Sequence, residues 1–311
     1  MAPIRDIATG IAATLAVFAA TLLLPIIGFF CTFLMPLPVL FYRVKLGRKP
    51  AVVIAGISAA IMAAVVGSPA VDLIIFVELM LIGFALAELY PLGFSVEQTV
   101  LAASAAALGV AAAAVVIFSI VAGKGPVALI GGYVGENLRV TLEMYRQVGV
   151  SPEVIDRIEG SLDQIQFVLV RLLPSLAASG SILISWACVL ISRPMLRSQG
   201  LPIPEFGALN RWRAPEQLVW AAIGCGVMLL LPAQSLKIIG MNGVIVLMAV
   251  YFFQGIAIVS FFFEKKRLPV ALRFILYSLI ALQQFLLLVV IGFGFFDMWL
   301  NFRKLEASQN E

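Results

Sequence analysis

A few polar side chains lie deep inside long apolar segments, where they could bind a ligand. Placing an ionisable side chain in a bilayer costs roughly 2.5–3.5 kcal/mol, so each such residue is expected to have a structural or functional role. Glu78 lies near the middle of the segment 70–90, too far from either end to reach interfacial water easily. Glu78, Gln254 and Gln283 fall at a similar depth, so a midplane layer of these residues could line a pocket. The candidate ligand-binding residues are Glu78, Gln254, Gln283, Gln284 and Arg171.

The alternative to a pocket is a structural role for the same side chains. Polar groups of neighbouring spans form hydrogen bonds worth about 0.6 kcal/mol on average. Arg171 could extend toward the interface or pair with a carboxylate such as Asp72. Six residues separate Asp72 from Glu78, which places their side chains about 120° apart around a helix. This spacing does not support acid–base catalysis by a pair of carboxylates.

Several other chemistries lack the residues that they need. The sequence contains no histidine, which excludes His-based triads, the common zinc sites and histidine proton relays. Its three cysteines are far apart in apolar stretches and form no CxxC motif. No P-loop, HExxH, GxSxG or Gly-rich Rossmann turn occurs. We therefore expect no catalytic residues, no metal and no cofactor, and the sequence favours a non-enzymatic protein.

The elements that must hold the candidate residues are membrane helices. Hydrophobic residues make up 62% of the 311 residues and charged residues only 12%, with a mean hydropathy of +1.07. A soluble domain has about 45–50% apolar and about 25% charged residues. The net charge of +4 comes from basic residues in short loops between apolar segments, which does not favour nucleic acid as a partner. The first apolar segment is expected to be an uncleaved span.

Apolar segments of about 20 residues predict an all-α transmembrane bundle of eight or nine spans. The first two segments are short and are separated only by Pro25 and Gly28. They form either a tight hairpin or one long broken helix, and both could be re-entrant. The candidate spans are 7–24, 26–42, 50–67, 70–90, 96–122, 164–192, 215–232, 242–263 and 269–297.

The positions of Lys and Arg predict the orientation of the chain. With the N-terminus inside, 12 of these residues fall on inner segments and 7 on outer segments. Arg303 and Lys304 are then outside, which is the weak point of this assignment. If the first two segments are one helix, the N-terminus moves outside and the rest is unchanged. The expected location is the bacterial cytoplasmic (inner) membrane.

Residues 133–163 are too charged to be a span, but their apolar residues recur at helical spacing. They predict an extracytoplasmic pair of amphipathic helices, with Gly149 ending the first and Pro152 starting the second. Their apolar faces would lie on lipid or on other spans, with a partner-docking role as the alternative. The predicted organisation is an N-terminal membrane bundle (1–192), a cytoplasmic loop (193–214) and a C-terminal bundle of three spans (215–311).

Two surfaces could contact other proteins. Ala12, Ala16 and Ala20 are spaced four residues apart in the first span, and small residues at this spacing let another helix approach closely. The Pro- and Gly-rich loop 193–214 reads as ordered and non-helical, with aromatic side chains. Its candidate partner residues are Phe206, Trp212, Arg213 and Pro215.

The C-terminal half carries patterns that indicate a family. The loop reads Phe206…Trp212-Arg213-Ala214-Pro215…Trp220, the next long span contains Tyr251-Phe-Phe-Gln254-Gly255, and the C-terminal motif includes Asp297, Trp299 and Arg303. In these patterns, and in length and span layout over most of the chain, the protein resembles the YybS-like family of predicted bacterial membrane proteins. The resemblance implies no active site.

A more distant likeness is to the substrate-binding membrane subunits of energy-coupling-factor vitamin transporters. Those subunits dock a partner through small residues of their first helix, a role that Ala12, Ala16 and Ala20 would take here. This chain departs from them in having several more spans and an outer amphipathic insert.

Two functions are favoured on these grounds. The first is a substrate-binding or transport-related membrane subunit, which would need a partner ATPase complex or an ion gradient because the chain has no nucleotide motif of its own. The second is a membrane scaffold or assembly factor that binds other membrane proteins and no small molecule. A third hypothesis, an intramembrane enzyme that acts on lipid, has no residues at catalytic spacing to support it.

Overall fold

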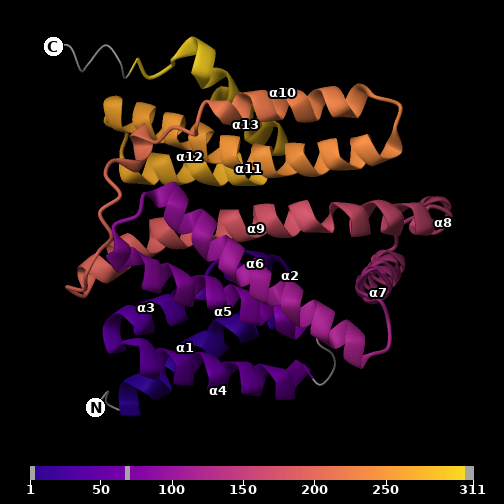
Figure 1. Ribbon diagram of the computed structural model, residues 1–311, viewed down its shortest axis with the longest axis horizontal. Coiled ribbons are helices and arrows are strands. Elements are labelled where there is room, and N and C mark those ends of the chain that lie inside the picture. The colour runs from indigo at the N-terminus through magenta and orange to yellow at the C-terminus, as the bar shows by residue number, and fades with distance from the viewer. Residues whose placement is uncertain (1–3, 67–70, 305–311) are drawn as a thin grey trace. The chain divides into compact units, whose positions relative to one another are not determined.

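The computed structural model describes residues 4–66 and 71–304, and it contains helices and no strands within them (Figure 1). Six of these helices are long and apolar enough to cross a membrane. They are α1 (Ile4–Leu23), α4 (Arg48–Val66), α5 (Val71–Leu89), α6 (Val96–Val121), α9 (Leu162–Ser198) and α11 (Gln234–Lys265). The prediction of an all-helical membrane protein with several spans is confirmed.

The chain divides into two compact units, which we describe separately. The first unit contains the residues up to Leu173 and Gly180–Glu205, and therefore α1 to α8 and most of α9. The second contains Pro174–Ser179 and the chain from Phe206 onward. Its helices are α10 (Gln217–Leu230), α11, α12 (Val270–Leu282) and α13 (Gln284–Leu300).

The predicted second span is divided into α2 (Pro25–Thr32) and α3 (Pro36–Leu46). Pro36 begins α3 and has no N–H with which to continue the preceding helix. The C-terminal end of α3 lies beside the start of α1, where the Tyr42 hydroxyl donates to Thr9 Oγ1 at 3.0 Å. Lys45 Nζ also lies 3.1 Å from Asp6 Oδ1. The first two segments therefore form a hairpin and not one long helix.

Serine hydroxyls on α9 fix this helix to others of the first unit. Ser185 Oγ lies 2.9 Å from Ser104 Oγ on α6, and both side chains are buried. Ser192 Oγ lies 2.8 Å from the Tyr90 hydroxyl, which follows α5. Such contacts satisfy polar groups where lipid offers no partner.

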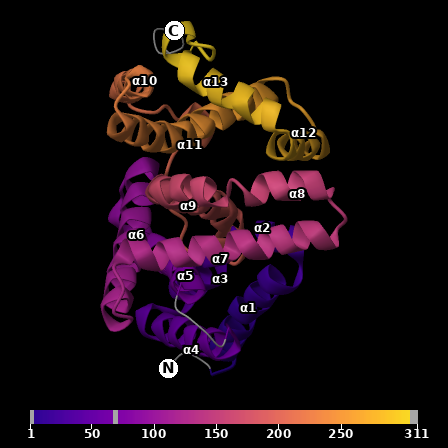
Figure 2. The ribbon, with the colours of Figure 1, turned by 90° about the vertical axis from the view of Figure 1, so that its right-hand side faces the viewer.

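The predicted amphipathic pair forms α7 (Pro126–Gln147) and α8 (Pro152–Glu159), which lie side by side in Figure 2. Gly149 has a φ of +83°, and Pro152 stands in the first turn of α8, as the sequence predicts. The first helix begins seven residues before the predicted boundary. The second does not run into the next span, because α8 ends at Glu159 and α9 begins at Leu162.

Two boundaries in the second half of the chain differ from the prediction. Residues 193–198 of the predicted non-helical loop continue α9, where Arg197 stands in the last turn and favours the negative end of the helix dipole. The rest of the loop contains one short 3₁₀ turn, η2 (Leu209–Arg211). The predicted span 269–297 is two helices, α12 and α13, bent by 101° at Gln283, whose backbone is extended.

Close contact between α11 and α13 holds the second unit together. A Cβ atom on Gly255 would overlap the carbonyl oxygen of Val290, and one on Gly294 would overlap the carbonyl oxygen of Tyr251. Only glycine lets the two backbones approach this closely. Tyr251 packs edge-on against Phe295, with ring centroids 5.3 Å apart, in a core that includes Val219 and Leu247.

We expect Gly255→Ala and Gly294→Ala to destabilise the protein by about 1–3 kcal/mol each, because the added methyl group meets backbone that cannot move aside easily. Thermal unfolding in mild detergent, followed by tryptophan fluorescence, measures the effect. The matched control is Gly292→Ala on the same helix, because nothing lies within 4 Å of its added Cβ. Equal melting temperatures for all three variants would show that α11 and α13 are not in close contact.

Candidate functional site

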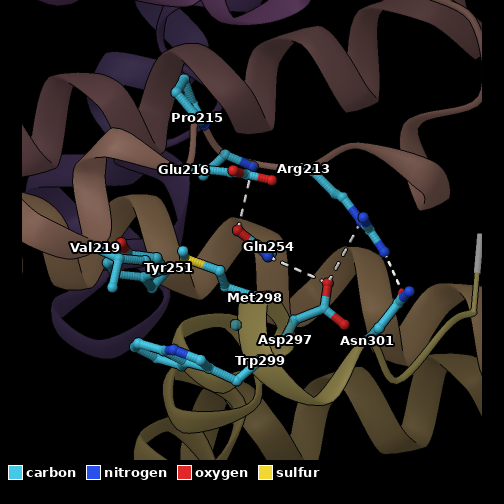
Figure 3. A pocket seen from close by; sticks show the side chains of 12 residues that line it. Arg213, Pro215, Glu216, Val219, Tyr251, Gln254, Asp297, Met298, Trp299 and Asn301 are labelled. Atoms are coloured by element: carbon cyan, nitrogen blue, oxygen red, sulfur yellow. Dashed lines mark hydrogen bonds and ion pairs between the residues drawn. The ribbon is translucent and has the colours of Figure 1, made fainter. Parts of the chain in front are cut away.

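The carboxylate of Asp297 is the centre of a polar cluster in the second unit (Figure 3). Its side chain, on α13, is fully buried. Asp297 Oδ2 lies 2.8 Å from Arg303 Nη2 and 3.9 Å from Arg213 Nε, and it accepts a hydrogen bond from Gln254 Nε2 at 3.2 Å. Oδ1 accepts from the backbone N–H of Phe302 at 3.0 Å. One carboxylate thus joins α11, α13, the loop before α10 and the chain after α13.

Arg303 is positioned by a turn at the end of α13. Asn301 has a φ of +40°, and this left-handed conformation reverses the chain so that Arg303 reaches back to Asp297. Arg303 Nη1 donates to the carbonyl oxygens of Asn210 at 3.0 Å and of Trp212 at 2.9 Å. Burial lowers the pKa of the Arg303 guanidinium, while its hydrogen bond to Asp297 acts in the opposite direction. The arginine stays charged and fastens the loop to the C-terminal motif.

The Gln254 side chain connects the loop to the carboxylate. Its Oε1 accepts a hydrogen bond from the backbone N–H of Ala214 at 3.2 Å, and its Nε2 donates to Asp297. Arg213 Nη2 donates to Asn301 Oδ1. Gln254 is 5% exposed, so its two hydrogen bonds are made away from bulk water. The Gln254 amide therefore links the loop at Ala214 to Asp297 on α13.

A cavity of about 240 Å³ lies beside the cluster. In Figure 3, Val219 and Tyr251 lie on one side of it and Arg213 and Asn301 on the other. The Tyr251 side chain is 3% exposed, and its hydroxyl has no hydrogen-bond partner among the described residues. Exposed residues at the edge connect the cavity to the surface. These edge residues are Pro215, Glu216 and Trp299.

The contacts of Asn210 place both ends of the α12–α13 pair beside one segment of the chain. Its Nδ2 donates to Glu264 Oε2 at 2.5 Å, near the end of α11, and its carbonyl accepts from Arg303, after α13. Both ends of the α12–α13 pair therefore lie beside the segment 206–214. The bent pair α12–α13 is either one broken span or a re-entrant loop. The membrane side of Arg303 and Lys304 therefore stays a prediction.

The structure brings some of the predicted site residues together. Gln254, from the ligand set, lies with Arg213 of the loop and with Asp297 and Arg303 of the C-terminal motif. Trp299 and Pro215 line the same cavity. Residues from the predicted ligand set, the predicted partner loop and the C-terminal motif therefore form one site.

The other predicted ligand residues lie elsewhere. Glu78 is in the first unit, where it accepts a hydrogen bond from Ser181 Oγ at 2.5 Å. Arg171 is exposed, and its guanidinium stacks on the Phe167 ring and donates to the Phe167 carbonyl. Gln283 and Gln284 are exposed at the bend between α12 and α13. The midplane layer of Glu78, Gln254 and Gln283 remains a prediction.

The predicted docking surfaces also remain predictions. Ala12 and Ala16 are exposed on α1, and Ala20 is half-buried. In the loop, Phe206 and Trp212 are half-buried.

Sequence reasoning missed Tyr251, Glu216 and Asn301 as parts of the site. Tyr251 and Asn301 stand inside quoted family patterns, but a single tyrosine in an apolar span carries no signal that its hydroxyl is unpaired. In the described part of the chain, no group of three or more Asp, Glu, Cys or His side chains could hold a metal ion.

We expect Asp297→Asn to destabilise the protein by about 3–5 kcal/mol, because it leaves the buried Arg303 and the nearby Arg213 without a countercharge. The substitution preserves the side-chain size, so packing changes little. Denaturant unfolding in detergent micelles measures the difference. Glu143→Gln, which removes an exposed partner of Arg146, is the control and is expected to unfold like the unmodified protein. An unchanged stability for Asp297→Asn would show that charge does not hold the cluster.

Comparison with known proteins agrees with this architecture. A family model described as "Predicted membrane protein (DUF2232)" matches residues 12–298, which include Arg213, Gln254 and Asp297. We found no match among curated proteins or among solved structures. The match extends from α1 into α13 and thus across both units. The chain belongs to the DUF2232 family of predicted membrane proteins.

Proposed function

We propose that this protein is a transport-related membrane subunit that binds a small polar molecule in the cavity beside Asp297. The observation that supports this most directly is the Tyr251 hydroxyl, which is buried at the cavity wall without a hydrogen-bond partner. An unsatisfied buried hydroxyl costs about 1–3 kcal/mol, and a ligand that accepts or donates there offsets the cost.

The lining of the cavity defines the class of ligand. Arg213 offers a cation, Glu216 an anion and Asn301 an amide, while Trp299 offers an aromatic surface. Ordinary small-molecule pockets have volumes of about 300–1,000 Å³, so a cavity of about 240 Å³ takes a small molecule. A compact molecule that carries both hydrogen-bond donors and acceptors fits this lining.

The position of the loop favours ligand binding over the scaffold alternative. A loop that docks a partner presents its side chains outward. Here the Trp212 carbonyl accepts from Arg303, and the Arg213 guanidinium donates to Asn301. The loop therefore forms one wall of the cavity, and it is held there through the Trp212 carbonyl and the Arg213 guanidinium.

The chain carries no nucleotide-binding motif, so transport would depend on a partner ATPase complex or on an ion gradient. Ala12, Ala16 and Ala20 form the proposed docking stripe for such a partner on α1. This arrangement follows the distant likeness to the substrate-binding subunits of energy-coupling-factor transporters. With the resemblance to the YybS-like family, it supports a location in the bacterial cytoplasmic membrane.

The proposed topology has eight crossings and one re-entrant pair. The crossings are α1, α2 with α3, α4, α5, α6, α9, α10 and α11. The pair α12–α13 enters and leaves on the inner side, as the contacts of Asn210 suggest. Both termini are then inside, α7 and α8 are extracytoplasmic, and 14 Lys and Arg face inward against 5 outward. This distribution follows the positive-inside rule better than the count with Arg303 outside.

Tyr251→Phe tests the ligand site. We expect purification in mild detergent, followed by mass spectrometry, to find a small polar molecule with the unmodified protein. At least 10-fold less should accompany the variant, because its ring cannot make the hydrogen bond. The ligand-free variant should melt at the same or a higher temperature, since it lacks an unsatisfied buried hydroxyl.

The matched control is Tyr277→Phe, on α12 and outside the cavity lining, which should retain the molecule. The proposal fails if the unmodified protein carries no small molecule, or if Tyr251→Phe retains it fully.

The topology predicts that green fluorescent protein fused after the C-terminus is fluorescent in bacteria and that alkaline phosphatase fused there is inactive. A cysteine introduced at Val148, which is 82% exposed between α7 and α8, should react with a membrane-impermeant maleimide in whole cells. An active C-terminal phosphatase would show that α12–α13 crosses the membrane.

A further inference from the structure

The carboxyl group of Glu78 lies deep within the apolar length of α5. Seven residues separate it from Val71 and eleven from Leu89, which places it about 10 Å and about 16 Å from the two helix ends. The hydrocarbon core of a bilayer is about 30 Å thick, so Glu78 is close to the greatest distance from water that a residue of this helix can have.

Glu78 has one polar partner in the described part of the chain, and it is uncharged. Ser181 Oγ, on α9, lies 2.5 Å from Glu78 Oε1, and Ser181 is 4% exposed. The same helix provides a comparison, because Glu88 lies 2.8 Å from Arg43 Nε and 3.4 Å from Arg48 Nε. The charge of Glu88 is thus balanced by two arginines, whereas Glu78 forms no ion pair with any described residue.

The half-buried Glu78 side chain lies along a groove of about 180 Å³ between α5 and α6. Every other side chain that lines the groove is apolar. These residues are Leu73, Ile74, Val77, Leu81, Val110, Ala111 and Ala114. Neither wall offers a hydrogen-bonding side chain that could solvate a carboxylate.

The charged residues of the surrounding helices lie away from this depth. On α5 itself the nearest is Asp72, six residues earlier, which accepts a hydrogen bond from Tyr133. On α6 it is Glu97, in the first turn. The others are Arg5 and Asp6 at the start of α1, Arg43 and Lys45 at the end of α3, Arg48 and Lys49 at the start of α4, and Asp163, Arg171, Arg193 and Arg197 on α9. The uncharged titratable groups are Tyr42, Tyr90 and Cys188.

A cation must therefore come from outside the protein if Glu78 is to lose its charge. Metal cations such as Mg²⁺ and Ca²⁺ take six or more oxygen ligands, and here the side chains offer only Glu78 and Ser181. A proton needs no further ligand. Intramembrane carboxylates with this kind of surroundings mark proton pathways in transporters and pumps.

We propose that Glu78 is a proton-binding site within the membrane, with Ser181 as its hydrogen-bond partner. In the protonated state the Glu78 O–H donates to Ser181 Oγ. When water enters the groove and accepts the proton, the Ser181 O–H donates to the carboxylate instead. The contact is kept in both states, so one proton leaves or returns without a change of partner. The site lies in the first unit and is independent of the cavity beside Asp297.

Labelling with dicyclohexylcarbodiimide tests the proposal, because this apolar reagent modifies protonated carboxyl groups that it reaches from lipid. The full-length protein is labelled in liposomes, and the adducts at Glu78 and Glu88 are measured by peptide mass spectrometry. We expect at least 10-fold more adduct at Glu78, and we expect it to fall as the pH rises from 6 to 9. Glu78→Gln should lose the adduct while keeping its melting temperature.

Ser181→Ala tests the hydrogen bond through the pH dependence of Glu78 labelling. A purely structural role of Ser181 would leave this pH dependence unchanged. Without the hydroxyl that stabilises the ionised carboxylate, labelling of Glu78 should persist to a higher pH than in the unmodified protein. Equal labelling of Glu78 and Glu88 would overturn the proposal, and so would labelling that does not depend on pH. Protection by NaCl but not by choline chloride at constant pH would also overturn it, because the site would then bind sodium.

Discussion

The second unit depends on the pairing of one buried carboxylate with two guanidinium groups. In water the Asp297–Arg303 pair would contribute little, but away from solvent either charge alone is expensive. Asp297 and Arg303 must therefore stay in contact with each other. This contact fixes the positions of the segments that are hydrogen-bonded to the pair. Through Arg303 the constraint reaches the carbonyls of the loop, and through Gln254 it reaches α11. The cavity lies beside this arrangement, and its walls include the segments that the cluster joins.

Much of the architecture could be predicted from the sequence, because lipid selects long apolar helices so strongly. Hydropathy placed α6 and α10 within about two residues of their boundaries, and turn chemistry placed the start of α8 at Pro152. The bend at Gln283 could not be predicted in this way, because 269–297 is apolar over most of its length and a single extended residue leaves no trace in hydropathy. The side assigned to Arg303 depends on this bend and stays a prediction.

The candidate site was only partly predictable, since its members were recognised for unrelated reasons. Gln254 was chosen for its depth, Arg213 for its place in the loop and Asp297 for a family-like motif. Their meeting depends on the glycine contact between α11 and α13 and on the left-handed turn at Asn301, which are tertiary features. By contrast, the depth of Glu78 was visible in the sequence, because an ionisable residue in the middle of an apolar span is unusual wherever its neighbours lie.

The bent pair α12–α13 also has a consequence for biogenesis. With 13 and 17 residues, neither helix reaches the length of about 20 with which a segment enters the bilayer on its own. In the folded unit α13 packs against α11, where Gly255 lets the two backbones approach closely. Arg303 then binds backbone carbonyls that were synthesised 93 and 91 residues earlier. The loop can therefore be fastened only after Arg303 has been made, and a chain that stops before Arg303 lacks these hydrogen bonds.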